Sequence, residues 1–385
     1  MRKMKVEIVY RQLNKYGEEL CGDRIEVQSN GENKYFVLSD GLGSGVKANI
    51  LSSLTTKIIA TMLREGCSMY EVAETLNKTL PICKERKIAY STFTALKINS
   101  SGDVESSEYD NPELLWFSEG KPKYIPRTKA KYSKKMIVSE SKFKLKEGDM
   151  LVAISDGIIH AGIGKTWDLG WSLERVTQFV KSILVIKKSA TEVCEEVIRV
   201  VNNLYAGEPG DDASVAVIHY RKKNEIIIMI GPPKDREKDK YVIEKLLSFR
   251  GKKIVCGGTT GSLVANYMGE EIEVLINTGT DDIPPMGKLK NIDLLTEGIL
   301  TFSTVVDMFR DGVPIDKIKY KIDGASKLYK EIYFADTVHF LLGEAINKAH
   351  QSIMTPLRLG LKYQLVKELE AILKSLGKEV IIERF

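Results

Sequence analysis

The sequence predicts an α+β domain followed by a smaller α/β domain. Before residue 222 the expected order is mixed, with strands, two helices, strands, a helix and a strand, and such an order favours antiparallel sheets. After residue 223 strands and helices alternate, which indicates a largely parallel sheet. The polar run 221–224 separates the two patterns, and 385 residues suffice for two to three domains. We therefore expect domains at 1–222 and 223–385.

In the first domain, alternating or short apolar runs predict strands, and apolar residues at helical spacing predict helices. The expected strands cover 5–12, 26–28, 35–38, 91–97, 114–117, 123–125, 150–154 and 213–220. The expected helices cover 47–65, 68–79 and 190–203. In the second domain we expect strands at 225–230, 253–256, 273–275 and 379–382, helices at 240–249 and 262–267, and mainly helices over 291–376.

Composition excludes several classes of protein. A net charge of +5, from 57 basic and 52 acidic residues, does not indicate a nucleic-acid binder. No apolar run approaches the ~20 residues of a membrane helix, and residues 1–10 lack the apolar core of a signal peptide. We expect a cytoplasmic protein without a membrane segment. Five cysteines without a CxxC pair and four histidines without metal-binding spacing leave carboxylates as the candidate metal ligands.

Three aspartates share one local setting, the edge of an apolar strand with glycine beside the aspartate or just before it. They are Asp40 in Leu-Ser-Asp-Gly, Asp156 in Ile-Ser-Asp-Gly and Asp211 in Gly-Asp-Asp. Glycine lets the backbone approach a ligand closely, and oxygen ligands suit Mg²⁺ or Mn²⁺. Two such ions about 3.5–4 Å apart could share a bridging water and clamp a phosphate ester. An ordinary turn is the better explanation of each of these sites when it is taken alone, because Asp-Gly is among the commonest turn dipeptides.

The order of six short motifs carries more information than any one of them. They are Gly22-Asp23, Asp40-Gly-Leu-Gly-Ser-Gly45 with Ala48, Ser91-Thr-Phe93, Asn111-Pro112, Ser155-Asp-Gly157 and Asp211-Asp-Ala-Ser214. Over residues 4 to 220 this series resembles the phosphatase domain of the stage II sporulation protein E family, a branch of the metal-dependent type 2C protein phosphatases. The resemblance implies a two-sheet antiparallel β-sandwich flanked by helices.

The resemblance also implies a site. Asp40 would bridge two Mn²⁺ or Mg²⁺ ions with help from the Gly41 carbonyl, and Asp156 and Asp211 would bind the other ion. The implied reaction is a single-step attack by metal-activated hydroxide on phosphoserine or phosphothreonine. In the family the substrates are often small anti-anti-sigma proteins of bacterial partner-switching circuits, so a protein of this kind is the expected partner.

Further residues are candidates for supporting roles at this site. Asp23 falls where the family has an acidic residue near the metals, and Asp212 would support its neighbour from behind. His160 could act as general acid or be an ordinary loop residue. The family's tail usually reads Asp-Asp-Met-Thr or Asp-Asp-Val-Thr, and here Ala213-Ser214 replaces its last two residues and keeps the hydroxyl.

The second domain lies outside the resemblance, and its main feature is a glycine-rich turn between a strand and a helix. The residues that could bind an anion through free backbone N–H groups are Gly257, Gly258, Thr259, Thr260, Gly261 and Ser262. The turn lacks the lysine of a P-loop, and an ordinary βα turn is the alternative. The loops 231–233 and 277–282 could gather with it at one sheet edge. The segment 291–310 could cover such a pocket or form a homodimer face.

The leading hypothesis is thus a serine/threonine phosphoprotein phosphatase regulated by its C-terminal domain. One alternative is a catalytically weak phosphoprotein-binding or scaffold protein, although Asp40, Asp156 and Asp211 are all present. The other is a sensor of a small phosphorylated or anionic ligand that binds the C-terminal domain.

Overall fold

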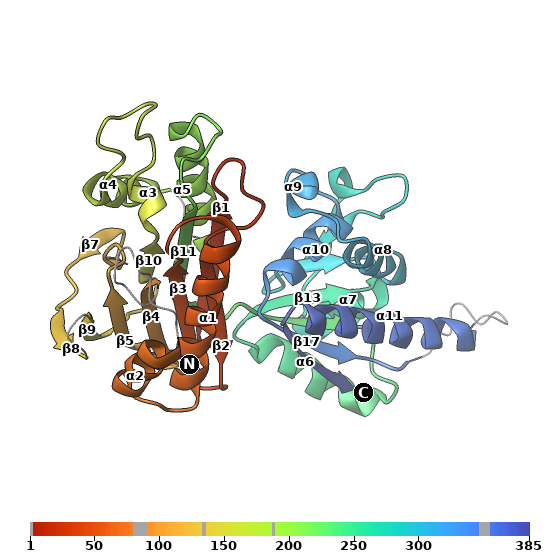
Figure 1. The fold of residues 1–385 in the computed structure, drawn as a ribbon. Coiled ribbons are helices and arrows are strands. Elements are labelled where there is room, and N and C mark those ends of the chain that lie inside the picture. Colours follow the sequence, from red (N-terminus) through yellow and green to blue (C-terminus); the bar gives the residue numbers. More distant parts are fainter. Residues whose placement is uncertain (1–2, 80–90, 133–135, 187–188, 346–354) are drawn as a thin grey trace. The chain divides into compact units, whose positions relative to one another are not determined.

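The computed structural model describes residues 3–79, 91–132, 136–186, 189–345 and 355–385 (Figure 1). The chain divides into two compact units, one of residues 3–222 and one of residues 223–385. In the described residues the first unit contains two sheets and the second unit contains one, and each unit has its own buried apolar residues. In the described part of the chain no helix has the length and apolar character needed to cross a membrane.

Two antiparallel sheets form the centre of the first unit, which confirms the predicted fold class. In the described residues one sheet has the order β1-β11-β10-β6-β7 and the other the order β2-β3-β4-β5-β9-β8. The strands of the first sheet are β1 (Met4–Leu13), β6 (Leu115–Ser118), β7 (Lys121–Lys123), β10 (Met150–Ile154) and β11 (Ala213–Lys222). Those of the second are β2 (Asp23–Ser29), β3 (Asn33–Asp40), β4 (Thr92–Asn99), β5 (Asp103–Tyr109), β8 (Thr128–Lys131) and β9 (Ile137–Lys144).

The two sheets pack face to face and helices cover their outer faces. Phe36 and Leu96 of the second sheet share a buried cluster with Leu151 and Ile218 of the first. Because side chains alternate along a strand, Val215 and Val217 of β11 point the other way, into a cluster with α4 (Leu173–Ile183) and α5 (Ala190–Leu204). On the opposite side α1 (Gly45–Arg64) and α2 (Met69–Thr79) pack against the second sheet. The short helix α3 (Asp156–Ile159) follows β10 directly.

The second unit is a doubly wound α/β fold. Its described strands run in the order β14-β15-β16-β13-β12-β17-β18, and β16, β13, β12, β17 and β18 are parallel neighbours. Their bounds are β12 (Glu225–Ile230), β13 (Lys252–Cys256), β14 (Glu273–Leu275), β15 (Met286–Lys288), β16 (Leu294–Thr296), β17 (Thr337–Leu342) and β18 (Glu379–Arg384). This smaller, largely parallel sheet was predicted.

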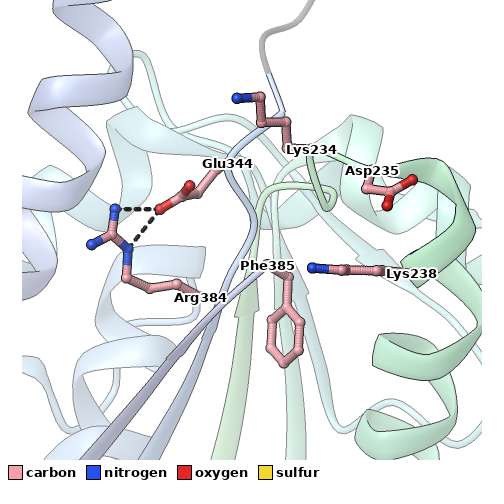
Figure 2. A pocket seen from close by; sticks show the side chains of 6 residues that line it. All are labelled: Lys234, Asp235, Lys238, Glu344, Arg384 and Phe385. Carbon is pink, nitrogen blue, oxygen red and sulfur yellow. Dashed lines mark hydrogen bonds and ion pairs between the residues drawn. The ribbon is translucent and has the colours of Figure 1, made fainter.

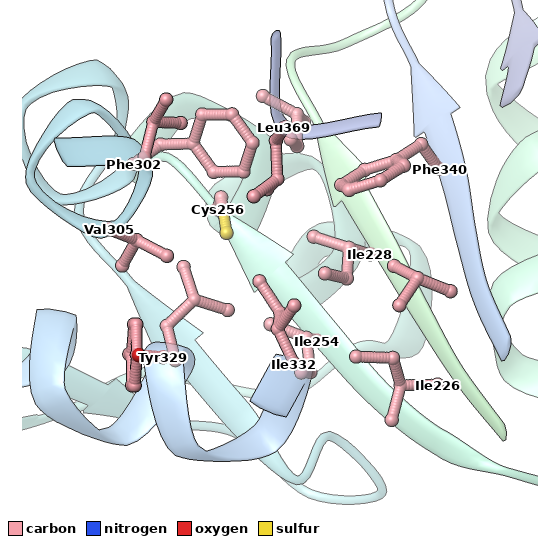
Figure 3. Packing of buried hydrophobic residues seen from close by; sticks show 14 of the residues in the cluster. Ile226, Ile228, Ile254, Cys256, Phe302, Val305, Tyr329, Ile332, Phe340 and Leu369 are labelled. Carbon is pink, nitrogen blue, oxygen red and sulfur yellow. The ribbon is translucent and has the colours of Figure 1, made fainter. Parts of the chain in front are cut away.

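Helices cover both faces of this sheet. On one face α6 (Asp239–Ser248) and α7 (Gly258–Met268) enclose a cluster with Met229 and Val255. On the other, α8 (Ile299–Arg310), α10 (Gly324–Phe334) and α11 (Thr355–Ser375) pack over Ile228 and Phe340 (Figure 3). The remaining short helices are α9 (Ile315–Ile318), η1 (Arg236–Lys238) and η2 (Ile276–Thr278).

The expectation that helices dominate 291–376 was wrong at two places. Residues 294–296 form β16, and residues 337–342 form β17 between β12 and β18. A strand buried on both faces reads as a continuous apolar run, and such a run cannot be told from a buried helix by periodicity alone.

Candidate active site

Five aspartates lie at one end of the sandwich, and two of them come from the second sheet. Asp23 begins β2 and Asp40 ends β3, and the two residues are direct partners in the antiparallel register. Asp156 follows β10, while Asp211 and Asp212 precede β11. Because β10 and β11 are antiparallel neighbours with Ile154 opposite Val215, their acidic ends lie at the same edge of the first sheet.

Hydrogen bonds through Ser214 join these two groups across the sandwich. The Ser214 hydroxyl donates to Asp23 Oδ2 at 2.7 Å, and the Ser214 backbone N–H donates to Ser155 Oγ at 2.9 Å. Gln12 Nε2 in turn donates to Ser214 Oγ at 2.8 Å. The aspartates of one sheet are therefore held to those of the other by buried hydrogen bonds.

Glycines beside the aspartates allow the chain segments to approach this closely. A Cβ on Gly41 would lie 2.0 Å from the backbone oxygen of Ala48, and one on Gly157 would lie 2.1 Å from the backbone oxygen of Asp212. A Cβ on Gly22 would lie 2.8 Å from Asp212 Oδ2. The glycines next to Asp40 and Asp156 are thus required by backbone packing rather than by a turn alone.

The aspartates repel one another. Burial, followed by the charges of Asp23 and Asp156, raises the pKa of Asp40. Burial also raises the pKa of Asp23, against hydrogen bonds from Ser155 and Ser214 that lower it, and burial with the Asp156 charge raises the pKa of Asp211. Two deeply buried carboxylate oxygens, Asp23 Oδ1 and Asp212 Oδ2, have no hydrogen-bond partner among the described residues. An unpaired buried carboxylate is costly, so the site favours a cation.

The donor set fits a hard divalent cation, since every candidate ligand is an oxygen atom. Among the residues that the structure describes, no three His, Cys, Asp or Glu side chains lie close enough together to hold a metal ion as they stand. The carboxylates are thus electrostatic neighbours without forming a tight cage. A cation among them would offset both the repulsion and the two unpartnered oxygens.

Asp212 and His160 differ in their surroundings. Asp212 is 3% exposed, accepts a hydrogen bond from the Lys15 backbone N–H at 3.0 Å, and donates its own N–H to Asp211 Oδ1 at 2.9 Å. It therefore holds its neighbour's carboxylate in place. His160 is exposed just after α3, where its backbone N–H donates to the Asp156 carbonyl. Its catalytic role stays a prediction.

Sequence reasoning missed Gln12 and the Ser155 hydroxyl as supports of the site. Gln12 reaches Ser214 because the two residues are partners in the β1–β11 ladder. Nothing local in the sequence marks that pairing. The Ser-Asp-Gly motif does contain Ser155, and its position before the aspartate was the available signal.

The glycine-rich turn of the second unit lies at the carboxyl end of β13, and α7 begins at Gly258. Thr260 and Gly261 are buried, whereas Gly258, Thr259 and Ser262 are exposed. The Glu297 carboxylate accepts a hydrogen bond from the Gly298 N–H and lies 3.7 Å from the position of a Cβ on Gly258. A carboxylate therefore already sits beside this helix start, which disfavours an anion there.

Comparison with known proteins identifies the family of the first unit. Residues 30–221 match the family model described as Stage II sporulation protein E (SpoIIE). The first unit is a SpoIIE-family domain. No curated protein matches the chain in sequence.

The chain is also similar to solved structures. The chain is similar to the RsbU and RsbW domains of Rv1364c from Mycobacterium tuberculosis, with 16% identity, a TM-score of 0.50, and coverage of 64% of this chain and 68% of that one. It also matches the PP2C phosphatase domain and regulatory-domain fragment of SpoIIE from Bacillus subtilis, with 18% identity, a TM-score of 0.48 and 58% of this chain covered. The match spans 64% of the length of that B. subtilis chain.

Proposed function

We propose that the SpoIIE-family unit is a metal-dependent phosphatase of phosphoserine or phosphothreonine in proteins. The observation that supports this proposal is the convergence of five aspartates from two sheets, fastened by the hydrogen bond from Ser214 to Asp23. By the family's usual role, the substrate would be a small anti-anti-sigma-like protein. We also propose that residues 223–385 regulate the reaction.

The proposal assigns roles to the following residues of the site. Asp40, the Gly41 carbonyl, Asp156 and Asp211 would hold two Mn²⁺ or Mg²⁺ ions. When bound, such ions would neutralise phosphate charge and lower the pKa of a water. The backbone N–H of Asp212 orients the Asp211 carboxylate. The Ser214 hydroxyl holds the Asp23 carboxylate by a hydrogen bond. The carboxylates would repel a phosphate in the absence of a cation, so we expect strict metal dependence.

Hydrolysis of p-nitrophenyl phosphate in Mn²⁺, by the wild type and by Asp40→Asn, tests the proposal. We expect the substitution to reduce the rate at least about 100-fold, because a carboxylate that would hold the metal is lost. Asp103→Asn is the matched control, since Asp103 lies at the start of β5 and pairs with Lys144, and its rate should equal that of the wild type. A second readout is the shift of the melting temperature with added Mn²⁺, which Asp40→Asn should lose.

The outcomes separate the proposed enzyme from a binding protein. Mn²⁺ could raise the melting temperature of the wild type while neither the full chain nor a chain ending at Lys222 hydrolyses the substrate. That result would favour a catalytically weak phosphoprotein-binding protein over an enzyme. If only the shortened chain is active, the second unit is an inhibitor. Equal rates for the wild type and Asp40→Asn would refute catalysis at this site.

A further inference from the structure

The second unit has a crevice at the carboxyl edge of its parallel sheet. Its volume is about 620 Å³, which lies within the usual range for small-molecule sites. Six residues line it, from the loop after β12, the loop after β17 and the end of β18: Lys234, Asp235, Lys238, Glu344, Arg384 and Phe385 (Figure 2). These residues are distant in the sequence, so only the fold brings them together.

The topology of the sheet favours a ligand at this place. The chain leaves β12 toward β13 on one side and later returns to β17 on the other, so the strand order reverses between β12 and β17. In open α/β sheets ligands bind outside the carboxyl ends of the strands at such a reversal. The crevice lies beside this point, because the Phe385 carbonyl accepts hydrogen bonds from Lys234 N at 3.3 Å and Glu344 N at 2.9 Å.

The charges of the crevice leave two cations available. Arg384 donates to Glu344 Oε1 at 2.6 Å and offsets its charge, whereas Asp235 accepts the neutral Glu237 N–H at 3.0 Å and keeps its own charge. Three cations thus face two acids among the lining residues. Lys234 and Lys238 have exposed side chains without an ion-pair partner among the described residues. In Figure 2 the Glu344 carboxylate lies between Arg384 and the two lysines. Two unpaired ammonium groups at one crevice match a group with two negative charges.

We propose that this crevice binds a small phosphate-bearing molecule, with Lys234 and Lys238 contacting the phosphate oxygens. The crevice differs from the glycine-rich turn that the sequence suggested, where the Glu297 carboxylate stands at the helix start. The inference does not depend on phosphatase activity, since the residues that carry it lie in the second unit.

Calorimetric titration of the full chain with inorganic pyrophosphate, in buffer with EDTA, tests this inference. We expect saturable binding, and we expect Lys238→Gln to weaken it at least about tenfold through loss of a charge-assisted contact. Lys240→Gln is the matched control, because Lys240 is two residues away, 74% exposed and outside the crevice. Its affinity should stay within about twofold of the wild type, and Lys234→Gln should behave like Lys238→Gln.

Three results would overturn the inference. They are no binding by the wild type at millimolar pyrophosphate, equal affinity in Lys238→Gln and the wild type, and equal weakening in Lys238→Gln and Lys240→Gln. Asp40→Asn must bind pyrophosphate as the wild type does. If it does not, the anion binds at the aspartates of the first unit, and the crevice is not the site. Far-UV circular dichroism of each variant confirms that it is folded.

Discussion

Gly157→Ala tests whether close backbone packing holds the candidate site together. The added Cβ would lie 2.1 Å from the Asp212 backbone oxygen and 3.3 Å from the Ala213 Cα. Non-bonded heavy atoms meet at about 3.5 Å, so one backbone must move by more than about 1 Å. Because the obstacle is backbone rather than the end of a side chain, it cannot rotate away. Asp156 and Asp212 would be pushed apart.

The expected cost follows from the size of this clash. Overpacking a buried position costs about 1–3 kcal/mol and occasionally more, and a contact this short belongs at the upper end, about 3 kcal/mol. For a domain of this size each kcal/mol corresponds to roughly 2–4 °C in melting temperature. We therefore expect a loss of about 6–12 °C together with most of the phosphatase activity.

Gly210→Ala provides the matched comparison. Gly210 also adjoins a site aspartate, but a Cβ there would meet only the Tyr205 ring edge at 3.4 Å. Thermal unfolding followed by circular dichroism should show a change below about 2 °C for Gly210→Ala. If Gly157→Ala melts and reacts like the wild type, or if both variants fall equally, the packing argument is wrong.

Two other substitutions test separate parts of the first unit. Burial raises the pKa of Glu7, but the nearby His219 ring and the Arg221 guanidinium outweigh it and lower the pKa from 4.5 to about 2. Glu7 therefore adds stability above pH 4.5 that is lost as the pH falls toward 2. After allowance for solvent screening, we expect Glu7→Gln to be about 1–2 kcal/mol less stable than the wild type at pH 7 and equally stable near pH 2, as measured by urea unfolding. A difference between the two proteins that stays constant with pH would contradict this. Ser214→Ala removes a hydrogen bond to the buried Asp23 carboxylate and should cost about 1–3 kcal/mol in the same assay, whereas an unchanged midpoint would show that the bond across the sandwich is dispensable.

The sequence identified the strand-end aspartates because their signal is local. An apolar run that stops at Asp-Gly indicates both the strand and its end, so Asp40 and Asp156 could be placed from neighbouring residues alone. Their convergence could not be read in this way, because it depends on which strands pair and in which register. The opposition of Asp23 and Asp40, and of Gln12 and Ser214, appears only in the folded ladders.

Prediction of the second unit from its sequence was limited in the same way. The alternation of strands and helices after residue 223 predicted its parallel sheet correctly. β17 was missed because both of its faces are buried, and its run of apolar residues carries no period of two. The crevice was missed for a different reason: Lys234, Glu344 and Arg384 have no common motif, and they meet only where three strands end at one edge of the sheet.

The electrostatics of the aspartates give Asp40→Asn a second consequence besides loss of activity. The pKa of Asp40 is raised, so in the metal-free protein its ionised form is less favourable when folded than when unfolded. Stability is therefore lost as the pH rises above the unfolded value of 3.8, and asparagine, which has nearly the same shape, removes that loss. We expect metal-free Asp40→Asn to be more stable than the wild type near neutral pH, by roughly 1–3 kcal/mol after allowance for partial exposure. Functional sites commonly keep groups that lower the stability of the folded protein. Urea unfolding in EDTA decides the matter: if Asp40→Asn is the less stable protein, the carboxylates do not repel one another, and the physical reason for placing a cation among them disappears.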